Sequence, residues 1–161
     1  MIILLTGVSG AGKTTVGERL ADDLGWPFYD GDAFHPKANI EKMRRNVPLT
    51  DADRRPWLAA LRHHIDDLVS QETDAVVACS ALKQAYRDQL LGSPGDVRLV
   101  LLKGDFALIQ HRMEKRRGHY FKVDLLRTQF DTLEEPTSSL VIDIAQPVEA
   151  MVQEIRQALG V

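Results

Sequence analysis

The fold of this chain is decided by one stretch, Gly7-Val8-Ser9-Gly10-Ala11-Gly12-Lys13-Thr14. It has the spacing of a phosphate-binding loop, in which a glycine and four further residues precede Gly-Lys-Thr. It follows the apolar run Ile2-Ile3-Leu4-Leu5, which predicts a buried strand, and precedes residues 15–24, which predict a helix. A strand, a glycine-rich turn and a helix present backbone N–H groups to an anion. The sequence therefore favours a phosphate site over an ordinary strand-to-helix turn with chance glycines.

Two side chains of this loop add chemistry to the backbone cradle. Lys13 places a full positive charge near the β- and γ-phosphates of a nucleotide, and the Thr14 hydroxyl is a ligand for Mg²⁺. We expect the phosphates to be held by the loop and by the first residue after it. These nucleotide-binding residues are Gly7, Val8, Ser9, Gly10, Ala11, Gly12, Lys13, Thr14 and Thr15.

Composition limits the classes of protein to which the chain can belong. Its 161 residues suit a single domain, and a net charge of −3 gives no general attraction to nucleic acid or to an anionic membrane. The one cysteine, Cys79, excludes an internal disulfide and lies in an apolar strand pattern, which favours a core residue over a nucleophile. We find no apolar run long enough to span a membrane and no signal peptide, so we expect a reducing, cytoplasmic setting.

Short apolar segments alternate with helical patterns along the whole chain. This alternation predicts a doubly wound α/β domain over residues 1–161, with a five-stranded parallel sheet covered on both faces. Gly25 is predicted to cap the C-terminal end of the first helix, and Thr50 with Asp53 predicts a capped start of a long helix. The predicted strands are 2–5, 27–30, 75–79, 97–103 and 140–144, and the predicted helices are 15–24, 50–69, 83–91, 106–117, 124–130 and 147–159.

The end of the second predicted strand carries two carboxylates, Asp30 and Asp32, on either side of Gly31. Ligands of such sheets bind at the carboxyl ends of the strands, and residues two apart in an extended segment face the same side. Both carboxylates are therefore expected beside the phosphate loop. Asp30 and Asp32 suit two tasks there, holding Mg²⁺ and accepting a proton from an attacking hydroxyl. A solvated turn is the alternative interpretation, because Asp-Gly is common in turns.

A dense group of cations ends the helix predicted over 106–117 and runs into a glycine-containing segment. Arg112 and Arg116 lie four residues apart and so share one helix face. This arrangement predicts a mobile lid, about 112–124, that brings an arginine to the transferring phosphoryl group. A solvated basic helix end that complements the helix dipole is the alternative. His119 either hydrogen-bonds a substrate or is exposed.

Two segments are candidates for the acceptor site. The first, about 32–72, lies between the second and third strands. Of six cations there, we expect about two to touch substrate: Lys37, Lys42, Arg44, Arg45, Arg54 and Arg55. It also holds His35, Asn39 and Trp57, and Trp57 is expected to be a packing residue. The second follows the third strand and would form the opposite wall. Its polar residues are Ser80, Lys83, Tyr86 and Arg87.

Ten stretches of the sequence carry a family resemblance. Besides 7–14 they are Asp-Gly-Asp-Ala-Phe-His-Pro (30–36), Asn-Ile-Glu-Lys-Met (39–43), Pro-Leu-Thr-Asp-Ala-Asp-Arg-Arg-Pro-Trp-Leu (48–58), Cys-Ser-Ala-Leu-Lys (79–83), Tyr-Arg-Asp (86–88), Leu-Lys-Gly-Asp-Phe (102–106), Arg-Arg-Gly-His-Tyr-Phe-Lys (116–122), Gln-Phe-Asp-Thr-Leu-Glu-Glu-Pro (129–136) and Asp-Ile-Ala-Gln-Pro (143–147). With these the chain resembles the small gluconate kinases, a branch of the phosphate-loop kinases related to shikimate kinase and adenylate kinase. The first stretch alone marks a broad superfamily, whereas the combination is specific.

The resemblance implies ATP-dependent phosphorylation of D-gluconate at its terminal hydroxyl, with Mg²⁺. It implies that Asp30 supports Mg²⁺, that Asp32 takes the proton of the acceptor, and that Arg54 pairs with the acceptor carboxylate. It places the remaining nucleotide contacts at Arg112 near the adenine, Arg116 on the phosphates, and Gln146 and Pro147 over the adenine edge. The acceptor residues are Asp32, His35, Arg54, Ser80, Lys83, Arg87 and His119, and the catalytic residues are Lys13, Asp32 and Arg116.

The third predicted strand ends in Cys79-Ser80 rather than in an acidic residue. A carboxylate that binds the metal directly at this strand end, common in the wider superfamily, is therefore absent. The metal would depend more on Thr14 and Asp30. The gluconate kinase pattern has this serine too, so the resemblance stands.

Three other functions remain open from the residues. A kinase for another small polyol acid, such as shikimate, would have the same fold and would differ within 32–57. A GTPase-like switch is disfavoured because the sequence has no Asn-Lys-x-Asp motif. A nucleic-acid-binding module is disfavoured by the negative net charge and by the lack of aromatic residues among the lid arginines. A homodimer stays open, since related kinases form dimers but no interface can be identified.

Overall fold

The computed structural model describes residues 1–117 and 123–161. In the described residues five strands form one parallel sheet in the order β2-β3-β1-β4-β5. This arrangement confirms the predicted doubly wound α/β fold. The strands are β1 (Ile2–Thr6), β2 (Phe28–Asp30), β3 (Ala75–Ala78), β4 (Val97–Lys103) and β5 (Leu140–Asp143).

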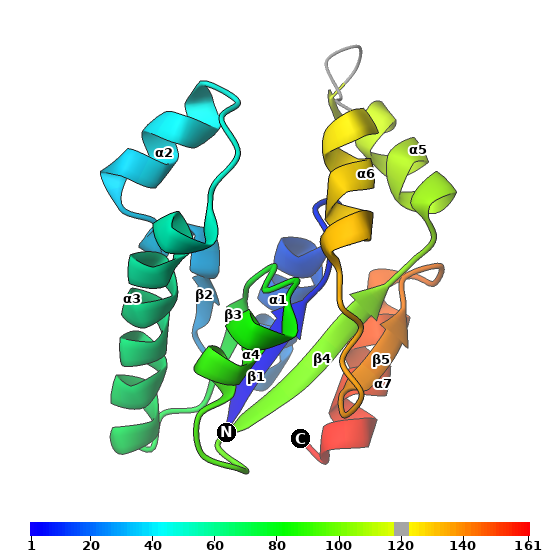
Figure 1. The fold of residues 1–161 in the computed structure, drawn as a ribbon. Coiled ribbons are helices and arrows are strands. Elements are labelled where there is room, and N and C mark those ends of the chain that lie inside the picture. The colour runs from blue at the N-terminus through cyan, green and yellow to red at the C-terminus, as the bar shows by residue number, and fades with distance from the viewer. Residues whose placement is uncertain (118–122) are drawn as a thin grey trace.

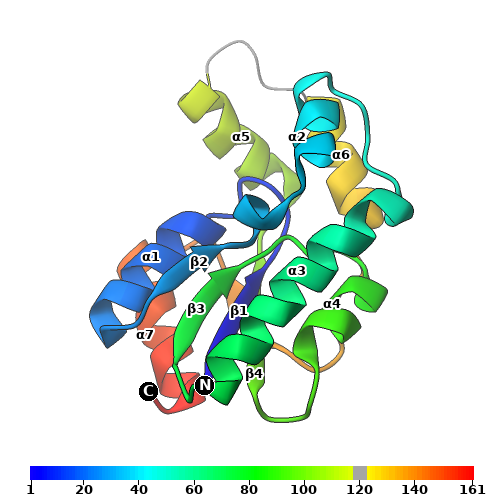
Figure 2. The same cartoon turned by 90° about the vertical axis from the view of Figure 1, so that its left-hand side faces the viewer.

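Helices cover both faces of the sheet (Figures 1 and 2). On one face lie α1 and α7, and on the other lie α3 and α4. The described helices are α1 (Lys13–Leu24), α2 (Lys37–Arg44), α3 (Asp51–Ser70), α4 (Gln84–Leu91), α5 (Phe106–Arg117), α6 (Val123–Thr132) and α7 (Val148–Leu159), with a short 3₁₀ turn η1 (Gly31–Phe34). In this part of the chain no helix is both long and apolar enough to cross a bilayer.

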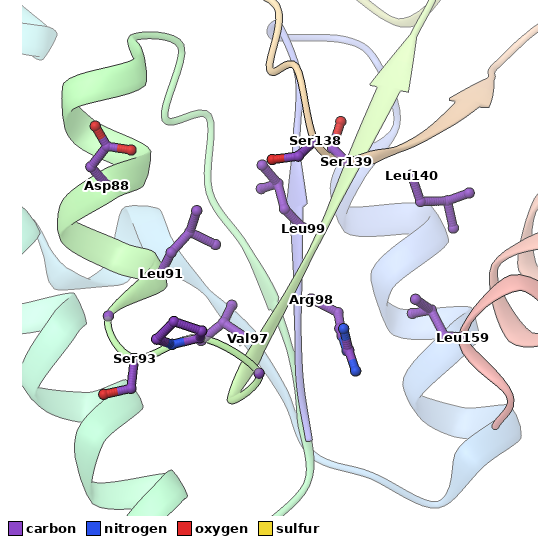
Figure 3. A pocket seen from close by; sticks show the side chains of 13 residues that line it. Asp88, Leu91, Ser93, Val97, Arg98, Leu99, Ser138, Ser139, Leu140 and Leu159 are labelled. Carbon is purple, nitrogen blue, oxygen red and sulfur yellow. The ribbon is translucent and has the colours of Figure 1, made fainter.

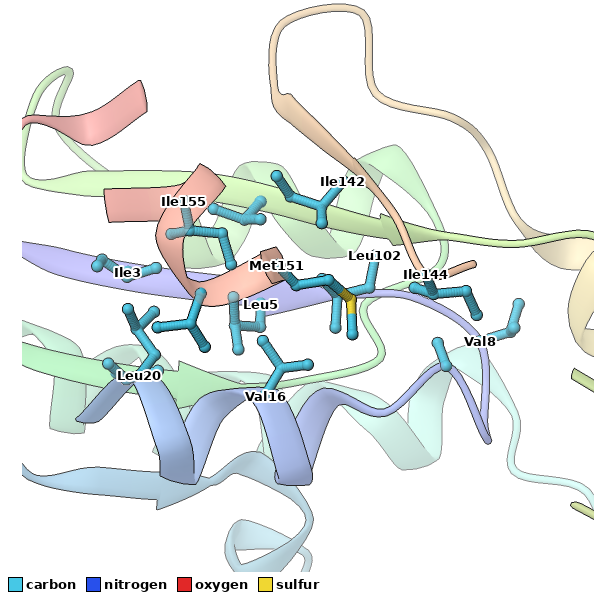
Figure 4. Close-up of a cluster of buried hydrophobic side chains, with 14 of the residues drawn as sticks. Ile3, Leu5, Val8, Val16, Leu20, Leu102, Ile142, Ile144, Met151 and Ile155 are labelled. Atoms are coloured by element: carbon cyan, nitrogen blue, oxygen red, sulfur yellow. The ribbon is translucent and has the colours of Figure 1, made fainter. Parts of the chain in front are cut away.

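The strands are apolar without alternation because they are buried on both sides. Successive strand residues point to opposite faces, so Ile3 and Leu5 pack towards α1 and α7, whereas Ile2 and Leu4 pack towards α3. Figure 4 shows the first of these clusters, with β1 side chains meeting those of α1, α7 and β5. Cys79 is buried in the second cluster, as predicted. Its burial raises the pKa of the thiol to about 12.

Two local predictions about helix ends are confirmed. Gly25 caps α1 in the left-handed conformation, with φ of 69°. Thr50 and Asp53 form a capping box at the start of α3. The Asp53 N–H donates to Thr50 Oγ1 at 3.1 Å, and the Thr50 N–H donates to Asp53 Oδ2 at 2.8 Å. Each bond satisfies a backbone donor that the helix itself leaves without a partner.

One helix was not predicted. Helix α2 lies in a segment that the sequence pattern leaves without an element, because four of its eight residues are charged and no apolar stripe marks a buried face. It begins after Pro36, and its Asn39 is buried. Beyond the carboxyl ends of the strands, α2 rises on one side of the molecule and α5 with α6 on the other (Figure 1). We call these two projections the acceptor arm (α2 and the start of α3) and the lid arm (α5 and α6).

Candidate active site

The phosphate loop lies between β1 and α1. Gly10 and Gly12 have φ of 81° and 93°, which non-glycine residues rarely adopt, so the turn needs glycine at these positions. Lys13 folds back over the loop, and its Nζ donates to the carbonyls of Gly7 and Val8 at 3.0 Å each. Burial lowers the pKa of Lys13, while the charge of Asp32 acts in the opposite direction. The loop therefore holds a poorly hydrated cation close to a carboxylate.

A cavity of about 370 Å³ opens beside this loop. It brings together three segments far apart in the sequence: the second half of the loop, the basic face of α5 and the turn before α7. Arg112 Nη2 donates to the Ile144 carbonyl at 2.6 Å, which ties α5 to that turn. The lining residues are Gly10, Ala11, Gly12, Thr15, Val16, Arg112, Lys115, Arg116, Gln146, Pro147, Val148 and Met151. The predicted phosphate, lid and adenine contacts thus share one hollow.

The acid pair lies where β2 ends and η1 begins. The Asp32 N–H donates to Asp30 Oδ1 at 2.9 Å. Between them, Gly31 lets the backbone after β2 lie close to the end of β3, since a Cβ at this position would lie 2.7 Å from the Ala78 carbonyl oxygen. Asp32 keeps contact with solvent, yet loss of hydration and the charge of Asp30 raise its pKa, against the effect of Lys13. Asp32 is thus close enough to Lys13 of the phosphate loop for each charge to shift the pKa of the other.

His35 forms part of one wall next to Asp32. Its ring stacks on Trp57, with centroids 4.2 Å apart and 15° between the planes. The Asn39 amide lies 3.2 Å from His35 Nδ1 and donates at 2.8 Å to the Asp53 carbonyl. Loss of hydration lowers the pKa of His35. The charge of Asp32 opposes this shift, and the charge of Arg54 adds to it. His35 therefore binds a proton less tightly than an ordinary histidine.

The second group of polar residues joins α3 to the start of α4. The Arg54 guanidinium and the Lys83 ammonium lie 5.7 and 5.6 Å from the centre of the Tyr86 ring. Lys83 Nζ lies 3.1 Å from Asp51 Oδ1, and the Tyr86 hydroxyl donates to the same oxygen. Arg54 also donates to the Leu49 carbonyl at 2.7 Å. The structure thus brings Arg54 and Lys83 together across the predicted acceptor walls, with Asp51 as an additional member.

Arg87 is placed differently from its prediction as an acceptor residue. Its side chain is fully buried on the inner face of α4. The guanidinium donates to the carbonyls of Ala81 at 3.0 Å, Leu82 at 2.9 Å and Glu134, and to Gln84 Oε1 at 2.8 Å. The prediction is wrong in this structure because the guanidinium is buried and donates its hydrogen bonds to backbone carbonyls rather than facing the acceptor. Arg87 joins β3, α4 and the segment after α6.

Three further predicted site residues, Ser80, His119 and Thr14, lie in separate parts of the chain. Ser80 follows β3, and its carbonyl accepts a hydrogen bond from the Thr6 hydroxyl. His119 lies outside the described residues, as do positions 118–122 of the predicted lid. Thr14 lies at the exposed start of α1.

Sequence reasoning missed two residues near the site. Gln129 of α6 accepts a hydrogen bond from the Ser9 N–H of the phosphate loop at 2.5 Å. Glu134 accepts from the Gln84 N–H at 2.7 Å, at the start of α4. Both lie in the stretch 129–136 that contributes to the family resemblance, but no local pattern assigns them a task.

A larger hollow of about 560 Å³ lies at the amino end of the sheet, away from the phosphate loop (Figure 3). Its walls come from the α4–β4 loop, the start of β5 and the end of α7. Asp88 and Arg98 are the ionisable residues among those that line it. None of the predicted site residues borders this hollow.

Comparison with known proteins places these features in a family. The shikimate kinase family model matches residues 9–159. The chain is 45% identical over 155 residues to the thermoresistant gluconokinase of Escherichia coli K12, covering 94% of this chain and 89% of that protein. The crystal structure of a gluconokinase from Sinorhizobium meliloti 1021 matches with a TM-score of 0.88 and 43% identity, covering 98% of this chain and 90% of that one. Shikimate kinase from Bacteroides thetaiotaomicron matches over 100% of this chain and 99% of that one, with a TM-score of 0.69 and 19% identity, a likeness of fold alone.

Proposed function

The chain belongs to the gluconokinase family, and from this membership we propose that it transfers the γ-phosphoryl group of ATP to the terminal hydroxyl of D-gluconate. The product is 6-phospho-D-gluconate. The observation that carries the proposal is the mutual electrostatic influence of Lys13 in the phosphate loop and Asp32 after β2, with the cations Arg54 and Lys83, suited to an acidic acceptor, beside Tyr86. Shikimate, the alternative acceptor, is represented only among distant relatives of this fold.

The transfer requires little covalent chemistry from the protein. The acceptor hydroxyl oxygen bonds to the γ-phosphorus, the bond to the bridging oxygen breaks, and ADP leaves. Asp32 receives the proton of the hydroxyl, and its raised pKa makes it a better proton acceptor than an ordinary aspartate. Lys13, the loop N–H groups and Arg116 stabilise the charge on the phosphoryl oxygens.

The residues present fit Mg²⁺. This ion prefers oxygen ligands, keeps several waters and is held through one or two carboxylates together with substrate phosphates. The Thr14 hydroxyl and the Asp30 carboxylate supply such oxygens, and no group of three or more His, Cys, Asp or Glu side chains forms a closed metal cage in residues 1–117 and 123–161. When bound, Mg²⁺ neutralises part of the phosphate charge. The protein orients Asp30 through the hydrogen bond from the Asp32 N–H.

Recognition of the two substrates divides between the arms. Arg54 pairs with the gluconate carboxylate, and His35, Ser80 and Lys83 hydrogen-bond its hydroxyls, within the segment 32–72 and the start of α4. Arg112, Gln146 and Pro147 hold the adenine, supported by their shared cavity. Residues 112–124 form the lid, and His119 belongs to it. A cytoplasmic location and a dimeric assembly stay predictions.

A panel of acceptors tests the function. ADP release is measured in a coupled assay with D-gluconate, shikimate, other sugar acids and D-glucose, which has the same terminal hydroxyl but no carboxylate. We expect D-gluconate to give the highest kcat/KM, and NMR of the product to place the phosphate on carbon 6. Faster turnover of shikimate or of D-glucose would refute the proposal.

A further inference from the structure

Gln129 contacts the phosphate loop from a distant part of the chain. Its side-chain oxygen accepts the Ser9 N–H at 2.5 Å, and 120 residues separate the two positions. Backbone N–H groups of such a loop are the donors that cradle phosphates. A side chain that engages one of these donors therefore acts on the phosphate-binding surface itself.

The contact lies at the end of the loop where the terminal phosphate belongs. The Ser9 N–H and the Val8 carbonyl are the two halves of one planar peptide group. Lys13 Nζ donates to that carbonyl at 3.0 Å. Gln129 accepts from the N–H, which points in the opposite direction from the carbonyl within the same peptide plane. Since the loop lysine reaches the β- and γ-phosphates, this peptide group is next to the γ-phosphate position.

Gln129 is held by the fixed end of its helix. One residue further on, the Phe130 ring packs against Phe106 with centroids 5.6 Å apart. The Glu134 N–H donates to the Leu82 carbonyl at 2.9 Å, and Glu134 Oε2 accepts from the Gln84 N–H. The end of α6 is thereby fastened to the carboxyl edge of the sheet. Gln129 can hold the peptide wherever the far end of the lid arm lies.

We propose that Gln129 is a positioning residue that sets the Val8–Ser9 peptide, and through it Lys13, for the γ-phosphate of ATP. This inference rests on the proposed kinase function. It gives a role in that function to a residue that is not among the proposed contacts to gluconate or to adenine. Its signature is selectivity for the nucleotide that carries a γ-phosphate. A residue needed only for folding would affect ATP and ADP alike.

The test compares Gln129→Met with Gln110→Met. Methionine keeps the length of the side chain and removes the acceptor, and Gln110 is a matched glutamine on α5 whose amide bonds Glu114 at 3.2 Å. Dissociation constants for ADP and for a non-hydrolysable ATP analogue are measured by calorimetry, together with kcat and KM for gluconate. The loss of one neutral hydrogen bond predicts roughly three- to tenfold weaker binding of the analogue. The loss for ADP should be smaller, because ADP keeps only the β-phosphate contact of Lys13.

We also expect kcat to fall about tenfold in Gln129→Met, with the KM for gluconate unchanged, and Gln110→Met to match the unaltered protein in every measurement. Equal weakening of ADP and analogue, or no change in either, would overturn the inference. The ratio of the two dissociation constants requires no acceptor. If the protein fails to phosphorylate gluconate but shows the expected ratio, the proposed acceptor is refuted and the role of Gln129 stands.

Discussion

Two residues at the centre of the site, Lys13 and Asp32, have pKa values that are shifted towards each other. Loss of hydration lowers the pKa of the ammonium and raises that of the carboxyl, and in each case the charge of the partner opposes the shift. Each group therefore helps to keep the other ionised. Replacing one changes the proton equilibrium of both.

The first prediction concerns the pH dependence of turnover. Asp32 must be ionised to accept a proton, so kcat should fall on the acid side, at a pH above the ordinary range of an aspartate. Asp32→Asn should lower kcat by a factor on the order of ten to a hundred and remove this acid limb. Steady-state kinetics across pH check both, with the affinity for ADP as the control. An acid limb that persists in the variant would assign the proton to another group.

The same variant carries a prediction about stability. A folded-state pKa raised above the unfolded value means that the folded protein binds this proton more tightly, so the stability contributed by Asp32 falls as pH rises through that pKa. At neutral pH the ionised carboxylate is therefore unfavourable, and Asn removes the cost. Thermal unfolding should give a higher Tm for Asp32→Asn at pH 7 than for the unaltered protein, and a smaller difference near pH 4. A lower Tm at pH 7 would contradict the assigned direction.

At the scale of elements, buried polar contacts fasten the lid arm to the sheet. Arg87 bonds to backbone carbonyls on both sides of the junction, at Leu82 of the β3–α4 connection and at Glu134 after α6. Glu134 returns a hydrogen bond at the start of α4. A change at Arg87 therefore acts on stability rather than on the acceptor.

Arg87→Met is predicted to destabilise the fold. Methionine fills part of the space but leaves buried carbonyls without donors, each costing about 1–3 kcal/mol. We expect a loss of about 3 kcal/mol in the free energy of unfolding by urea, with the KM for gluconate of the folded fraction little changed. Arg98→Met, at an exposed arginine of β4, is the control and should leave stability unchanged. A raised KM for gluconate in Arg87→Met, with the free energy of unfolding unchanged, would instead support Arg87 as an acceptor residue.

Local signals explain which elements could be predicted from sequence. The loop spacing, the apolar strands and the pair Thr50 and Asp53 each act within a few residues, and the structure contains all three. Helix α2 could not be predicted because it has no apolar stripe. Arg87 and Gln129 depend on partners contributed by distant segments, which no spacing along the chain reveals. The sequence thus predicts the phosphate loop and the acid pair at the strand ends where the structure has them, whereas the buried position of Arg87 depends on contacts with distant segments.

At the scale of the whole molecule, the acceptor arm and the lid arm stand on opposite sides of the strand ends (Figure 1). The acceptor contacts proposed at Arg54 and the phosphate contact proposed at Arg116 belong to different arms. Phosphoryl transfer needs the terminal hydroxyl of an acceptor held by Arg54 and the Arg116 guanidinium to reach one γ-phosphate, in a site from which water is excluded. The two arms must then approach each other when both substrates bind.

Small-angle X-ray scattering checks this approach. The radius of gyration should decrease when a non-hydrolysable ATP analogue and gluconate are added together, and less when either is added alone. The protein without either ligand, measured in the same buffer, serves as the control for effects of the solution. An unchanged radius with both ligands would mean that the arms are already in their working positions.

The single buried thiol has a practical consequence. Cys79 is enclosed in the core with a pKa raised to about 12, so maleimide reagents, which need an accessible thiolate, should leave it unmodified. Fluorescent dyes could then be attached to cysteines introduced at Met43 of α2 and Leu125 of α6, which are 43% and 55% exposed, without first removing a native thiol. Single-molecule energy transfer between these two dyes would then report the distance between the acceptor arm and the lid arm during turnover.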